Sequence, residues 1–176
     1  MKTSLEEFDQ IVRPIERQMM QTVWHILGDV HDAEDALQDA LTIVLKRWKR
    51  VARHDNPHAL IVKICADCAY DHLRSKIRLS RRHQVLDKLD KPSHLNDAAE
   101  QLSRRELRRE IMSAIAKLSR NQASAFLLRS TEGQSYDCIA AALGCSVATA
   151  RKHVARARYR LSILLQPLTP TKGSAI

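Results

Sequence analysis

The chain has 176 residues, enough for one large domain or two small ones. Only 4% of the residues are aromatic and glycine and proline are few, a composition that favours helices and argues against a packed β-sandwich. A formal net charge of +9 indicates a polyanionic partner, most simply nucleic acid. No apolar run reaches the length of a membrane span and the N-terminus lacks a signal-peptide core, so we expect a cytoplasmic protein with reduced cysteines and no membrane insertion.

The charge is divided into blocks along the chain. Residues 1–40 hold three basic and nine acidic side chains, a net charge of −6, and residues 41–82 hold eleven basic and three acidic ones, a net charge of +8. Residues 83–103 hold two basic and four acidic side chains, a net charge of −2, and residues 104–160 hold twelve basic and four acidic ones, a net charge of +8. Two basic blocks therefore flank an acidic connector, behind an acidic N-terminal block. This pattern predicts two contacts with one polyanion and a separate, basic partner for the N-terminal part.

Two amphipathic helices are predicted in the N-terminal part. Apolar residues recur at helical spacing over 8–28, where Pro14 predicts a helix start or a bend and Gly28 predicts the end. Asp32 is placed to cap a second helix over 33–51. The side chains of this second helix are acidic in its first turns and basic in its last turns. This reversal is explained either by simple matching to the helix dipole or by a binding site for a partner. The open side of its acidic end carries Glu34, Asp35, Gln38 and Asp39.

A third helix is predicted from Pro57 to about Ile77, because proline is favoured at the first helical position and apolar residues then follow a helical period. Basic side chains lie off its apolar face and form a surface suited to phosphates. They are Lys63, Arg74, Lys76 and Arg78, extended by Arg81 and Arg82.

Cys65, Cys68 and His72 on this helix have a spacing that suggests metal ligands. A closed zinc site needs a fourth ligand and usually a turn between the cysteines. Both cysteines also fall on the apolar stripe, where a free cysteine packs as a small hydrophobe. Core packing is therefore the preferred interpretation, and metal or redox sensing remains the alternative.

The last part of the chain predicts a helix-turn-helix. Tyr136 begins a short helix with apolar residues at i, i+3, i+4 and i+7, and Gly144 is placed to end it in a left-handed conformation. Ser146 is placed to cap a second helix that runs to about Leu161 and has a basic outer face. This combination is typical of a DNA-reading module, whereas the alternative is an ordinary helical hairpin with solvated charges.

The remaining segments support this outline. Residues 83–103 interrupt any apolar period and predict a linker, and two further helices are expected before Gly133. No nucleophile–base pairing, glycine-rich phosphate loop or HExxH pattern occurs in the sequence. We therefore predict a protein that is not an enzyme and has no cofactor.

Three motifs follow one another along the chain: Asp32-Ala33-Glu34-Asp35 with Gln38, Asp39 and Trp48, then Asn56-Pro57 with Lys63, Asp71 and Arg74, and last Glu132-Gly133 with Ser135 to Arg158. In this order they resemble the sigma-70 family of RNA polymerase sigma factors, and the small size resembles its extracytoplasmic-function (ECF, group IV) members. The resemblance implies an all-α fold of two small helical domains joined by a linker, the second ending in the helix-turn-helix. The implied divisions are 1–80 (sigma domain 2), 81–103 (linker), 104–166 (sigma domain 4) and 167–176 (tail).

The resemblance also implies partners and site residues. The partners are core RNA polymerase, through its largest-subunit clamp and its flap, promoter DNA and an anti-sigma factor. The surface that docks on the clamp corresponds to Glu34, Asp35, Gln38 and Asp39. The −10 element is met by positions corresponding to Lys63, Asp67, Arg74, Lys76 and Arg78. The −35 element is met by positions corresponding to Arg129, Ser146, Thr149, Arg151, Lys152 and Arg156.

Some positions depart from the family pattern. Leu60 stands where the family often has Trp, and Asp67 stands where it often has Asn near the flipped −10 base. A carboxylate can accept from a cytosine amino group but repels phosphate, so unusual −10 recognition is expected. Lys152 and Ala155 also differ from the residues that are frequent on the reading face. The alternative function is a stand-alone helix-turn-helix regulator that binds DNA without polymerase.

Overall fold

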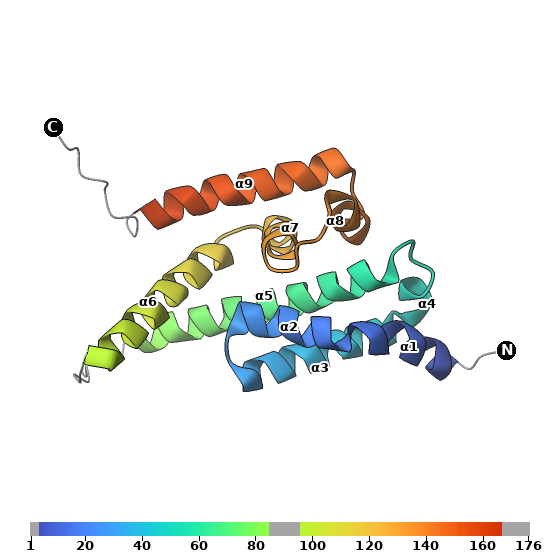
Figure 1. Ribbon diagram of the computed structural model, residues 1–176, viewed down its shortest axis with the longest axis horizontal. Helices are drawn as coiled ribbons and strands as arrows, with labels where there is room; N and C mark the ends of the chain where they lie inside the picture. The colour runs from blue at the N-terminus through green and yellow to red at the C-terminus, as the bar shows by residue number, and fades with distance from the viewer. Residues whose placement is uncertain (1–3, 85–95, 167–176) are drawn as a thin grey trace.

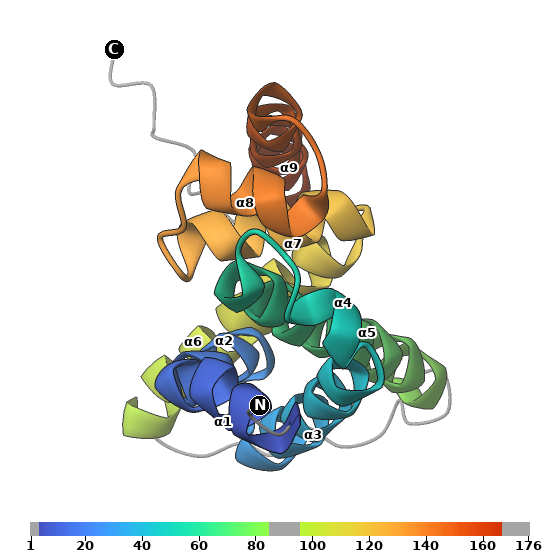
Figure 2. The ribbon, with the colours of Figure 1, turned by 90° about the vertical axis from the view of Figure 1, so that its right-hand side faces the viewer.

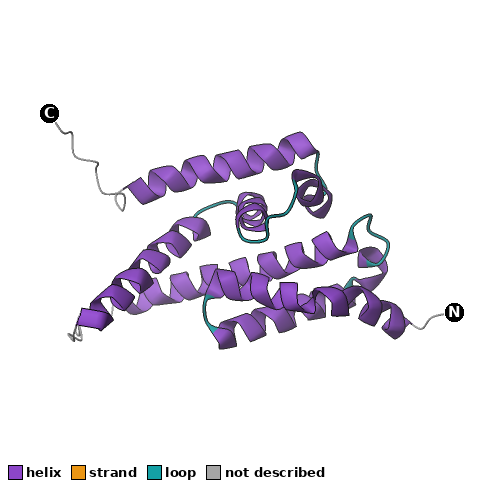
Figure 3. Cartoon of the chain, viewed as in Figure 1, coloured by secondary structure: helices purple, strands orange, loops and turns teal. Residues whose placement is uncertain are grey.

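The computed structural model describes residues 4–84 and 96–166, and every regular element in these ranges is a helix (Figures 1 and 3). The predicted all-α fold is therefore confirmed. The elements are α1 (Ser4–Val12), the 3₁₀ turn η1 (Arg13–Ile15), α2 (Glu16–Leu27), α3 (Val30–Lys46), α4 (Trp48–Val51), α5 (Pro57–Gln84), α6 (Asn96–Ala116), α7 (Arg120–Ser130), α8 (Tyr136–Leu143) and α9 (Val147–Leu165).

The first predicted helix is interrupted where the sequence indicated. Pro14 lies in the 3₁₀ turn η1 between α1 and α2, because proline has no N–H to donate and disrupts a continuous helix. Gly28 ends α2 with φ +69°, as predicted. The predicted cap at Asp32 is wrong: Asp29, in extended conformation, accepts a hydrogen bond from the Asp32 backbone N–H over 3.1 Å. A capping residue must precede the helical conformation, and Asp32 already lies inside α3.

The second predicted helix is also not continuous to residue 51. Arg47 leaves the helical region with φ −109° and ψ 17°, and separates α3 from α4. The break turns Trp48 onto the core, where its ring meets Phe8 edge-on at 5.0 Å between centroids. Burial of this large ring compensates for the interrupted backbone ladder.

Helices extend into the predicted linker 81–103 from both sides. α5 continues to Gln84, beyond the predicted end at Ile77, and α6 already begins at Asn96. The rest of that linker and the predicted tail 167–176 lie outside the described residues.

α5 occupies the middle of the molecule. It packs against α2 and α3 on one side and against α7 and α8 on the other, as the two perpendicular views show (Figures 1 and 2). One apolar cluster is shared by both halves of the chain, and its members include Met19, Val23, Val44, Ile61, Tyr70, Ile115, Leu127 and Leu161. A second cluster joins Val62 of α5 to Leu128, Ile139 and Val154. The two predicted domains are therefore docked on each other through α5.

Candidate nucleic-acid interface

The predicted helix-turn-helix is formed by α8 and α9. Ser135 caps α8 by accepting from the Cys138 N–H, and Ser146 caps α9 by accepting from the Thr149 N–H, both over 3.2 Å. Gly144 joins the helices with φ +62°, and a Cβ at this position would meet no atom within 4 Å. Glycine is therefore required here by the left-handed backbone and not by crowding.

The outer face of α9 is basic and open. Arg151, Lys152 and Arg156 are all exposed on it. A shared aromatic contact places two of the predicted −35 residues side by side: the guanidinium groups of Arg129 and Arg151 lie 4.8 and 5.2 Å from the centre of the Tyr136 ring. This contact was not predicted from the sequence, because the helical period assigns Tyr136 only to the apolar face of α8.

A backbone contact fixes Arg129 further. Its Nη1 donates to the Gln134 carbonyl over 2.8 Å, which holds the end of α7 against the loop before α8. Of the other predicted −35 residues, Ser146 acts as the cap of α9, and its Oγ lies 2.9 Å from the hydroxyl of Thr149. The structure thus places Ser146, Thr149, Arg151 and Lys152 in the first turns of α9, Arg129 beside Arg151 on the Tyr136 ring, and Arg156 further along the same helix.

The predicted clamp-docking residues share the open side of α3. Glu34, Asp35, Gln38 and Asp39 are all exposed. Asp39 lies 2.8 Å from the imidazole Nε2 of His72 on α5, whereas Asp35 and Gln38 have no side-chain partner among the described residues. The result is an acidic face that is available for a basic partner.

The five predicted −10 residues on α5 fall into two groups. Arg74, Lys76 and Arg78 are exposed, and Lys76 pairs with Asp32 of α3. Asp67 instead lies where α7 packs on α5, and Lys63, which is partly buried, pairs with it.

Asp67 is 7% exposed and is held from both helices. Its Oδ2 lies 2.7 Å from the Lys63 ammonium one turn earlier on α5, and its Oδ1 accepts a hydrogen bond from Ser124 Oγ of α7 over 2.6 Å. Arg120 adds a weaker contact, with 3.9 Å between its Nη1 and Asp67 Oδ2. In this arrangement Asp67 joins the two halves of the chain and is not open to a nucleotide.

Two further polar contacts join the same helices. The buried hydroxyl of Tyr70 donates to the carbonyl of Leu118 over 2.5 Å. Arg120 pairs with Asp71, and the hydrogen bond to this carboxylate raises the pKa of the guanidinium. Sequence reasoning missed this group of residues. The sequence feature that could have indicated this contact is Ser124, a hydroxyl side chain within a stretch of apolar residues.

The cysteines of α5 pack in the core, as preferred from the sequence. Cys65 is 0% exposed and Cys68 is 6% exposed. Burial raises the pKa of both thiols, that of Cys68 to about 11, which disfavours the reactive thiolate. His72 faces Asp39, and residues 4–84 and 96–166 contain no cluster of three side chains suited to holding a metal ion. In those same ranges no helix has the length and apolar content to cross a membrane.

Comparisons with known proteins agree with this geometry. Residues 11–79 match the family model for sigma-70 region 2, and residues 108–161 match that for sigma-70 region 4. The RNA polymerase sigma-E factor of Streptomyces antibioticus is 30% identical over 156 residues, which cover 88% of this chain and 82% of the relative. The ECF RNA polymerase sigma factor SigC of Mycobacterium tuberculosis is 31% identical over 153 residues, covering 84% and 79%.

A solved structure has the same fold. It is the sigma factor RpoE of Bartonella quintana in complex with the anti-sigma factor NepR, with a TM-score of 0.53, 23% identity and coverage of 92% of this chain and 98% of that one. The two region models match in chain order on either side of the linker, which supports a sigma factor and not a stand-alone helix-turn-helix regulator. The chain belongs to the extracytoplasmic-function group of the sigma-70 family of RNA polymerase sigma factors.

Proposed function

We propose that this sigma factor binds core RNA polymerase through the acidic face of α3 and directs it to promoters through basic surfaces of α5 and α9. The proposal rests on the separation of charge within the structure: the exposed face of α3 is acidic, and the outer faces of α5 and α9 are basic. This role requires no cofactor and no chemistry of its own, and it places the protein in the cytoplasm with the polymerase.

The acidic face of α3 is the proposed docking surface for the clamp of the largest subunit. Glu34, Asp35 and Gln38 occupy two turns of one exposed helix face, and Asp39 extends it toward α5. Their acidic charge is complementary to a basic surface and would speed association as well as fix orientation. The flap of the polymerase is the proposed contact of the second half of the chain.

The N-terminal half of α9 is the proposed reader of the −35 element. Its exposed Arg151, Lys152 and Arg156 have the arrangement that enters a major groove, where arginine pairs with guanine O6 and N7. Stacking of Arg129 and Arg151 on Tyr136 limits their rotamers before DNA arrives. These side chains therefore lose less freedom on binding.

The proposed −10 surface on α5 requires a rearrangement. Arg74, Lys76 and Arg78 are exposed, but Asp67 is buried against Ser124 of α7 and is paired with Lys63. A strand that reads all five residues therefore needs a state in which α7 has left α5, and the apparent affinity falls with the fraction of molecules in that state. We propose that core polymerase favours the separated state and that a protein of the anti-sigma class favours the docked state.

A charge-reversal variant tests the proposed clamp surface. Asp35→Arg with Asp39→Arg should abolish binding to purified core polymerase, because both substitutions place like charges against a basic partner. The fold should be retained, since both side chains are exposed and the ion pair between Asp39 and His72 is a surface pair. Binding is measured by pull-down of core enzyme and by run-off transcription with reconstituted holoenzyme.

The chain offers a matched control. Glu106→Arg with Glu110→Arg makes the same charge change at the same i,i+4 spacing on the exposed face of α6. This control leaves the proposed clamp surface intact and should therefore bind core polymerase much more tightly than the α3 variant. Unchanged affinity of the α3 variant, or equal losses in both variants, would contradict the docking assignment.

A further inference from the structure

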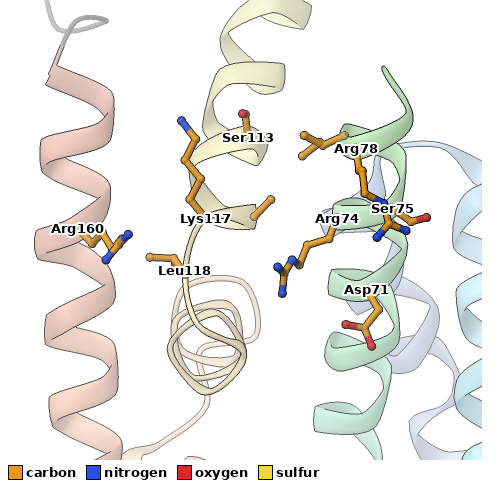
Figure 4. Close-up of a pocket in the computed structure, with 10 residues that line it drawn as sticks. Asp71, Arg74, Ser75, Arg78, Ser113, Lys117, Leu118 and Arg160 are labelled. Carbon is orange, nitrogen blue, oxygen red and sulfur yellow. The ribbon is translucent and has the colours of Figure 1, made fainter. Parts of the chain in front are cut away.

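A basic cleft lies between α5, the end of α6 and the C-terminal half of α9, on the part of α9 that is distant from the turn at Gly144 (Figure 4). Its volume is about 1100 Å³. Four cationic side chains from both halves of the chain line it: Arg74 and Arg78 on α5, Lys117 directly after α6 and Arg160 on α9. Figure 4 shows these residues around the opening between the three helices.

The charge of this cleft is not neutralised by the protein. Within the described part of the chain, none of the four cations has a carboxylate within 4.0 Å. Asp71 is the one acidic residue among those that line the cleft, and it is paired with Arg120. Because like charges repel, an anion that contacts several of these exposed cations would lower their mutual repulsion.

The chemistry of the lining indicates phosphate. Four cations offer several N–H donors, and the lining also includes the hydroxyl side chains of Ser75 on α5 and Ser113 on α6. The volume is slightly above the usual range of about 300–1,000 Å³ for small-molecule sites. A single phosphate would satisfy only some of these groups, whereas a chain of phosphates can reach cations on more than one helix.

We propose that this cleft binds a small polyphosphate, either inorganic or the polyphosphate part of a nucleotide. The anion contacts Arg74 and Arg78 from one half of the chain and Lys117 and Arg160 from the other, so it bridges α5 to α6 and α9 and stabilises the docked arrangement. Binding does not depend on the proposed function. The effect of binding on transcription does rest on the proposed function: a ligand on Arg74 and Arg78 competes with the −10 strand for these side chains and lowers transcription.

Isothermal titration of the full chain with inorganic tripolyphosphate, without polymerase, tests the site. Sodium sulfate at equal ionic strength is the control for general charge attraction. Saturable binding of tripolyphosphate is expected, and Lys117→Gln with Arg160→Gln should weaken it about a hundredfold, as expected for two lost charge-assisted hydrogen bonds. Both positions are exposed, so the fold is retained.

A second variant and a control decide whether the ligand bridges. Arg78→Gln alone should weaken binding about tenfold from the α5 side. Lys49→Gln with Arg53→Gln removes one exposed lysine from α4 and one exposed arginine from the turn before α5, neither of which lines the cleft, and should leave the affinity unchanged. A nucleoside triphosphate in place of tripolyphosphate identifies the source: tighter binding indicates a nucleotide, and equal binding indicates the phosphate chain alone.

Several outcomes would overturn the proposal. They are no binding of tripolyphosphate beyond that of sulfate, an equal loss in the control pair, or dependence on cations from only one half of the chain. Tighter, equally dependent binding of a short single-stranded oligonucleotide would reassign the cleft to nucleic acid. Because every readout uses the free chain, a failure here is distinguishable from a failure of the clamp assignment.

Discussion

The hydrogen bond from Ser124 to Asp67 allows a quantitative test of the docking of α7 on α5. Both residues are buried, with 0% and 7% exposed, and the bond length is 2.6 Å. A hydrogen bond to a charged group contributes about 1.5–3 kcal/mol. Ser124→Ala leaves the carboxylate its ion pair with Lys63. We therefore expect this substitution to lower the free energy of unfolding by about 1.5–3 kcal/mol and not by the larger cost of an unpaired buried charge.

A double-mutant cycle isolates the contact across the two halves of the chain. Ser124→Ala, Asp67→Ala and the double variant are compared by urea unfolding, followed by circular dichroism. The coupling energy should equal about 1.5–3 kcal/mol if the two side chains meet in solution. A cycle of Ser124→Ala with Ser146→Ala, the distant cap of α9, should be additive within about 0.5 kcal/mol. Additivity in the first cycle as well would refute the docked arrangement.

Four other substitutions make separate predictions. Gly144→Ala should lower the free energy of unfolding by about 1–2 kcal/mol in urea titrations, because alanine is strained at φ +62°. Arg156→Ala should weaken holoenzyme binding to the −35 element by about 1–3 kcal/mol and relax selectivity at one base pair in mobility-shift competition; equal losses on all sequences would assign it to phosphate. Tyr136→Leu should weaken the same binding with unchanged selectivity, since its ring orients arginines without reading bases. Burial raises the pKa of the Cys68 thiol from 9.0 to about 11. The contribution of this buried thiol to the free energy of unfolding is therefore fully present below pH 9 and is lost as the pH rises toward 11. Cys68→Ala should make that loss smaller, as measured by urea unfolding at several pH values.

Local chemistry explains which elements were predictable. The cap at Ser146 and the left-handed Gly144 depend on neighbours within four residues, so the sequence predicted both correctly. At the break at Arg47, the following Trp48 contacts Phe8, which lies 40 residues away in the sequence. Periodicity alone continues the helix through that point, because Trp48 also fits the helical stripe.

The site residues divide in the same way. The exposure of the acidic face of α3 and of the basic face of α9 follows from amphipathic spacing within each helix, and the structure agrees with both. The contacts of Tyr70 with Leu118 and of Asp67 with Ser124 join residues 48 and 57 positions apart. No period within one helix identifies such pairs. The sequence alone therefore did not predict that the two halves of the chain dock on each other.

Docking also accounts for the departure of Asp67 from the family pattern. An asparagine at this position would still accept from Ser124, but it would form no ion pair with Lys63 and no long-range attraction to Arg120. The negative charge of this carboxylate thus stabilises the docked arrangement, whereas it repels a phosphate backbone. When α7 leaves, Arg120 leaves with it, and Asp67 and Lys63 remain as a nearly neutral pair on α5. On the proposed assignment, attraction of the −10 strand then comes from Arg74, the neighbouring Lys76 and Arg78 further along the helix, and the pair reads a base without adding net charge.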